Sequence, residues 1–89
     1  MLAVYKYPLD KDFINLPIGF KILHVGKQNE DLFAWALINP KETEFTTALR
    51  VVGTGRIIDT ESDVEGKFWG TYLLYNDSLV LHVWEIPQN

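Results

Sequence analysis

The segment from residue 67 to residue 86, KFWGTYLLYNDSLVLHVWEI, constrains the fold of this chain more than any other part. It contains two runs of aromatic and β-branched residues, which is the composition of β-strands. Asn76-Asp77-Ser78 lies between the runs and is typical of a turn. The segment therefore predicts a β-hairpin. No part of the chain keeps a 3.6-residue apolar period long enough to predict a helix.

The rest of the chain continues this pattern. Apolar runs bounded by turn residues predict further strands at 2–7, 20–27, 32–39 and 44–54. Gly53 and Gly55 indicate a bulge or sharp bend at the end of the last of these. We expect at most one helical turn near residues 60–66, which are polar. The sequence thus predicts one all-β domain over 1–89, a small antiparallel sandwich or partly open barrel of about six strands.

The strand expected at 32–39, LFAWALIN, is apolar on both faces. Phe33, Trp35 and Leu37 point to one side, and the residues between them point to the other. A strand that is apolar on both faces is covered on both faces. A chain of 89 residues buries only about 60–65% of its unfolded surface, so another copy of the protein is a candidate for one cover. We therefore expect a homo-oligomer.

Charge and composition exclude several classes of protein. The net charge is −4 and the basic residues are scattered, so we expect no direct nucleic-acid binding. The absence of cysteine excludes disulfides and thiolate sites, and it suits the cytoplasm. The first residues do not resemble a signal peptide. The longest apolar run, from Leu32 to Ile38, is far shorter than the roughly 20 residues of a membrane helix, so we expect no membrane association.

Gly53-Thr54-Gly55-Arg56 is the strongest local candidate for a binding site. The glycines allow backbone N–H groups to approach an anion, Thr54 offers a hydroxyl, and Arg56 can bind phosphate or carboxylate in two places. No helix is expected after this segment, so it is neither a Walker loop nor a dinucleotide fingerprint. The alternative is a glycine bulge followed by a solvated arginine.

No residue pattern predicts a metal, a cofactor or a catalytic group. His24 and His82 are the only histidines and have no ligand spacing, whereas a metal site needs three or four ligands. The acidic residues from Asp59 to Glu65 alternate as in a calcium loop, but Val64 stands where that loop needs glycine. A small hydrolase that uses His82 with Glu85 or Asp59 is the one enzymatic alternative.

The aromatic residues have two readings. Trp35, Trp69 and Trp84, with Tyr72 and Tyr75, could stack on the base of a ligand. Such residues more often fill a core or an interface, where each buries on the order of 150–250 Å².

Several short motifs follow one another along the chain: Tyr5-Lys6-Tyr7-Pro8, Leu16-Pro17-Ile18-Gly19, Val52-Gly53-Thr54-Gly55, Gly70-Thr71 and the segment from Leu79 to Glu85. Their order resembles that of a family of short phage and prophage proteins of unknown function. Arg56 stands where we expect a histidine, which argues against acid–base chemistry at this position. The resemblance implies a protein of the host-cell cytoplasm that acts by binding, for example by blocking a host defence.

These observations together predict a non-catalytic, homo-oligomeric binding protein. By the resemblance it is a phage counter-defence protein, which sequesters a nucleotide-derived immune signal or blocks a host defence protein. The alternatives are a phage structural or assembly subunit and the small hydrolase. The predicted ligand site consists of Gly53, Thr54, Gly55 and Arg56, with one or two of Trp69, Thr71, His82 and Trp84.

Overall fold

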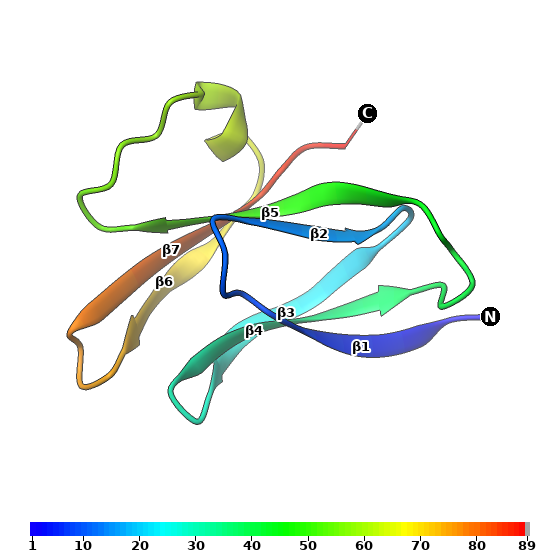
Figure 1. Cartoon of the computed structure of the whole chain (residues 1–89), viewed down its shortest axis with the longest axis horizontal. Coiled ribbons are helices and arrows are strands. Elements are labelled where there is room, and N and C mark those ends of the chain that lie inside the picture. The colour runs from blue at the N-terminus through cyan, green and yellow to red at the C-terminus, as the bar shows by residue number, and fades with distance from the viewer. Residues whose placement is uncertain (89) are drawn as a thin grey trace.

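A computed structural model describes residues 1–88 and shows seven strands and one short 3-10 helix (Figure 1). The elements are β1 (Ala3–Pro8), β2 (Phe13–Pro17), β3 (Lys21–Gln28), β4 (Asp31–Ile38), β5 (Phe45–Gly53), η1 (Glu61–Val64), β6 (Phe68–Leu74) and β7 (Leu79–Glu85). The all-β prediction and the helical turn near residues 60–66 are confirmed. The strand beyond the expected six is β2, whose apolar residues pair with β5.

The strands form two antiparallel sheets that do not close into a barrel. The three-stranded sheet has the order β1-β4-β3, and the four-stranded sheet has the order β2-β5-β7-β6. The predicted hairpin 67–86 is the β6–β7 pair. Figure 1 shows that residues 54–67, between β5 and β6, project away from the sheets and carry η1.

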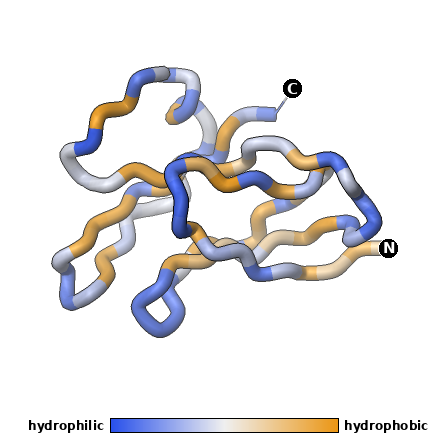
Figure 2. Tube along the Cα trace, in the orientation of Figure 1, coloured by the Kyte–Doolittle hydropathy of each residue, from blue (hydrophilic) through white to orange (hydrophobic). Residues whose placement is uncertain are grey.

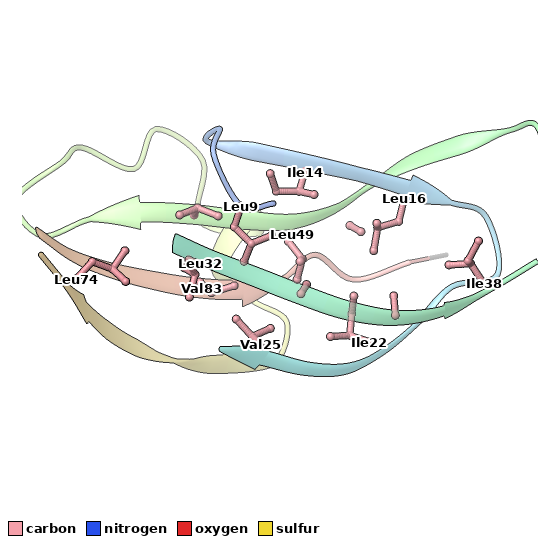
Figure 3. Close-up of a cluster of buried hydrophobic side chains, with 14 residues drawn as sticks. Leu9, Ile14, Leu16, Ile22, Val25, Leu32, Ile38, Leu49, Leu74 and Val83 are labelled. Atoms are coloured by element: carbon pink, nitrogen blue, oxygen red, sulfur yellow. The ribbon is translucent and has the colours of Figure 1, made fainter. Parts of the chain in front are cut away.

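The core lies between the inner faces of the two sheets, because alternate residues of each strand point inward. Leu16, Leu49 and Val83 are fully buried there, and they come from β2, β5 and β7 of the four-stranded sheet. Figure 3 shows them among the side chains contributed by the other sheet. Hydrophilic residues gather at the connections, for example at the tip between β3 and β4 (Figure 2).

Strand β4 buries one of its two apolar faces. Leu32, Ala34, Ala36 and Ile38 are in the core. On the outer face Phe33, Trp35 and Leu37 are only half-buried. The prediction that both faces are covered is therefore not met within a single chain, since the second sheet packs against the inner face alone. Whether another copy covers the outer face stays a prediction.

Two hairpin tips contact each other at one end of the molecule. Asn29 and Glu30 form the β3–β4 turn, and Tyr75, Asn76 and Asp77 lie in the β6–β7 turn; all five have positive φ. The Glu30 carboxylate accepts a hydrogen bond of 2.5 Å from the Tyr75 backbone N–H. This contact joins the two sheets at their hairpin ends.

Candidate functional site

An open cleft of about 1140 Å³ lies where β5 ends. One side is the β1–β2 connection, Leu9 to Asp12, and the other is the chain that leaves β5, from Gly53 to Thr60. The first residues of β7 complete the lining. All four residues of the predicted segment Gly53-Thr54-Gly55-Arg56 line this cleft, so the structure places the core of the predicted site in a concave surface.

The Gly53–Arg56 segment forms a tight turn, as its glycines indicate. The Arg56 N–H donates to the Gly53 carbonyl at 3.1 Å, and the Thr54 N–H donates to the Val80 carbonyl at 3.2 Å. Gly55 has φ +87°, a conformation that favours glycine. Because these two N–H groups already have partners, the turn does not present the full row of free amides that the sequence suggested. The exposed Arg56 side chain is the group in this turn that can still bind an anion.

Three predicted residues meet in a hydrogen-bond chain beside the cleft. The His82 Nε2 lies 2.7 Å from the Thr54 hydroxyl, and its Nδ1 lies 2.9 Å from the Thr71 hydroxyl. Thr71 is directly opposite His82 in the β6–β7 ladder. The imidazole therefore joins the turn after β5 to strands β6 and β7. Trp84 follows on the same face, with its ring centroid 6.4 Å from that of His82.

Trp69 does not join this group. The register shifts between Phe68 and Gly70, and Trp69 packs against the core. Its Nε1 donates to the Glu85 carboxylate at 3.1 Å, and the Lys67 ammonium lies 3.8 Å from its ring centroid. This register and the bond to Glu85 therefore keep Trp69 apart from the other predicted residues, of which only one or two were expected at the site.

The arrangement gives no support to the hydrolase alternative. Residues 82 and 85 are three positions apart on one strand, so His82 and Glu85 point to opposite faces of the sheet. Asp59 lines the cleft, whereas His82 lies outside its lining. His24 is on the other sheet and packs against Trp35. No group of three or more metal-ligating side chains occurs in residues 1–88.

Arg50 also lines the cleft, although no motif in the sequence indicated it. Arg50 is on β5 in register with Phe13 of β2 and Trp84 of β7, and its side chain is only 8% exposed. Its guanidinium carbon lies 4.6 Å from the centroid of the Phe13 ring. The sequence feature that could have identified Arg50 is a single charge between the apolar Leu49 and Val51, which are both buried, in a strand that is otherwise apolar at this end.

Fold and cleft together define a small domain of two facing antiparallel β-sheets, with an arginine-containing cleft at the end of one central strand. The chain belongs to the family described as domain of unknown function DUF7352, whose model matches residues 1–89. No curated protein and no solved structure gives a significant match to it. Within residues 1–88, no helix has the length and apolar character needed to cross a membrane.

Proposed function

We propose that the protein is a non-catalytic, homo-oligomeric binding module that sequesters a small nucleotide-derived ligand. The observation that carries the proposal is the cleft at the end of β5, which contains the Gly53–Arg56 turn. Its volume of about 1140 Å³ is ample for a ligand of nucleotide size. Arg56 supplies a cation for phosphate. The half-buried Trp84 ring and the Thr54–His82–Thr71 chain lie beside the cleft, and of these residues Thr54 lines it.

The biological side of the proposal depends on the motif resemblance. The Val52–Gly55 and Leu79–Glu85 motifs resemble those of short phage and prophage proteins. We propose that this protein acts in the host cytoplasm against a host defence, by removing a nucleotide signal. Direct blocking of a host defence protein is the variant of this role in which the cleft holds part of that protein.

Ligand-dependent thermal stability tests the binding role. A ligand that binds only the folded state raises the melting temperature by mass action. We expect a cyclic or linear nucleotide to do so, and Arg56→Ala to remove the shift. Lys41→Ala is the matched control, because it deletes the same charge in the turn after β4, outside the cleft. If no nucleotide in such a screen shifts the wild-type protein, sequestration is refuted.

A structural or assembly role is the second candidate, and the outer face of the three-stranded sheet favours it. Val4 is 54% exposed there, opposite the half-buried Leu37, and the half-buried Phe33 and Trp35 lie further along the same face. This role predicts a stable oligomer that is indifferent to nucleotides. Sedimentation at high and low concentration tests self-association, with Trp35→Lys expected to dissociate the oligomer. A wild-type monomer at high concentration would contradict both the oligomeric and the assembly proposals.

A further inference from the structure

Arg50 is a buried cation without a counter-charge. Its side chain is 8% exposed, and no carboxylate lies within ion-pair distance of it in residues 1–88, where the one ion pair joins Lys27 to Glu30. Charged side chains are almost never buried unless they are paired. Removing a guanidinium from water without an anion is costly. The position therefore requires an explanation beyond packing.

Backbone contacts account for only one corner of the guanidinium. Nη1 donates to the Val51 carbonyl at 2.8 Å and to the Asp12 carbonyl at 3.3 Å. Nε is buried and has no hydrogen-bond partner. The edge formed by Nε and Nη2 is one of the two edges with which arginine binds two oxygens of a phosphate or carboxylate. Nη1 holds the β1–β2 connection in place through its bond to Asp12, and this role does not use the Nε–Nη2 edge.

The surroundings fix the plane of the guanidinium before any ligand arrives. The Phe13 ring stacks on it at 4.6 Å, and Trp84 is its register neighbour on the other side. Aromatic stacking holds an arginine in place while leaving its edges free to donate. Phe13 is itself 44% exposed, and its ring covers a face of the guanidinium and not the Nε–Nη2 edge.

We propose that the Arg50 guanidinium binds phosphate in a subsite of the cleft at the end of β5. Lys11 and Arg56 line the same cleft and supply further positive charge. The carboxylates that also line it are those of Asp10, Asp12, Asp59 and Asp63. All except the half-buried Asp63 are exposed. Water and salt screen these exposed charges, Lys11 and Arg56 included, whereas the buried Arg50 is screened far less.

The inference rests on the proposed function because it places the ligand in the same cleft, and it adds the group that is recognised and the residue that binds it. The test uses inorganic pyrophosphate in calorimetric titrations, since it carries no base. We expect saturable binding by the wild-type protein and at least tenfold weaker binding by Arg50→Met. Met has a similar volume, and replacing a buried charge with an apolar residue is often tolerated.

Two further measurements keep the test decisive if Arg50→Met fails to fold. Arg50→Lys keeps the charge and loses the two-oxygen geometry, so we expect weaker binding. In the wild-type protein, the Nε–H resonance of Arg50 should shift during the pyrophosphate titration. An unmoved resonance, or wild-type affinity in either variant, would overturn the inference. Citrate binding as tight as that of pyrophosphate would overturn the assignment to phosphate.

The two proposals fail separately. If pyrophosphate binds at Arg50 and no nucleotide does, the subsite stands and nucleotide sequestration is refuted. If a nucleotide raises the melting temperature while Arg50→Met binds it as the wild type does, the binding role stands and the subsite is refuted.

Discussion

Replacing Gly66 with alanine should be among the most damaging single-methyl additions in this protein. Gly66 lies where the chain approaches β6, against the end of β7. A Cβ at this position would run into the carbonyl oxygen of Glu85, and it would lie 3.0 Å from the carbonyl carbon and 3.1 Å from the Pro87 Cδ. The two closest obstacles are backbone atoms, so no rotamer change relieves the clash, and the segment must move away from β7.

The cost follows from what this movement breaks. Lys67, the next residue, accepts a 2.7 Å hydrogen bond from the Glu85 N–H, and losing it costs about 1 kcal/mol. Forcing an extra carbon into a packed site costs about 1–3 kcal/mol more. We therefore expect Gly66→Ala to lower the free energy of unfolding by about 2–4 kcal/mol.

Gly19→Ala is the control, because at Gly19 an added Cβ has open space but the backbone is strained, whereas at Gly66 the Cβ clashes with its neighbours. Gly19 has φ +88°, yet nothing lies within 4 Å of an added Cβ. Its cost is the left-handed backbone alone, about 1–2 kcal/mol. Urea unfolding followed by tryptophan fluorescence compares the two variants. If Gly66→Ala unfolds at the same urea concentration as Gly19→Ala or a higher one, the steric reasoning is refuted.

Three further predictions concern the hydrogen-bond chain, a turn and a tyrosine. His82→Ala removes both imidazole hydrogen bonds, so it should lower the free energy of unfolding by about 1–2 kcal/mol and make proteolysis after β5 faster. Thr71→Val removes one of the two bonds and should cost about half as much; equal costs for the two variants would contradict two independent bonds. Asp77→Gly relieves φ 67° and should raise stability in urea by about 0.5–1 kcal/mol, whereas Asp77→Ala should not; equal effects would refute the strain. Burial raises the pKa of the Tyr72 hydroxyl above its usual 10.0, so the folded state holds this proton more tightly than the unfolded state does. The free energy of unfolding should therefore fall as the pH rises above about 10. The urea midpoint of the wild-type protein should drop between about pH 9 and pH 11, and Tyr72→Phe should make this drop smaller. A drop of the same size in the variant would disprove the contribution of Tyr72.

Local composition predicted the strands that are long and regular, and it failed for β2. That strand has only five residues, its register shifts between Ile14 and Asn15, and it ends at Pro17. Its partner, β5, lies far along the sequence, so pairing alone makes it a strand. Residue patterns contain no comparable signal for pairing at such a distance.

The site was predictable where it depended on backbone chemistry. The glycines of the Gly53–Arg56 segment indicated a turn, and that turn lines the cleft. The composition of the sequence could not show which of Trp69, Thr71, His82 and Trp84 lie together, because the register shift beside Trp69 has no signature in composition. Arg50 was missed because its burial depends on Phe13, which β2 brings alongside β5.

The position of β7 between β5 and β6 has a consequence for synthesis on the ribosome. The three-stranded sheet has all its strands once residue 38 has been made. By contrast, β6 has no neighbour in its sheet except β7, which is the last strand in the sequence. The edges of β5 and β6 that pair with β7 therefore stay unpaired until residues 79–85 are available. A chain released without residues 79–85 would expose both of these edges and would be prone to aggregate.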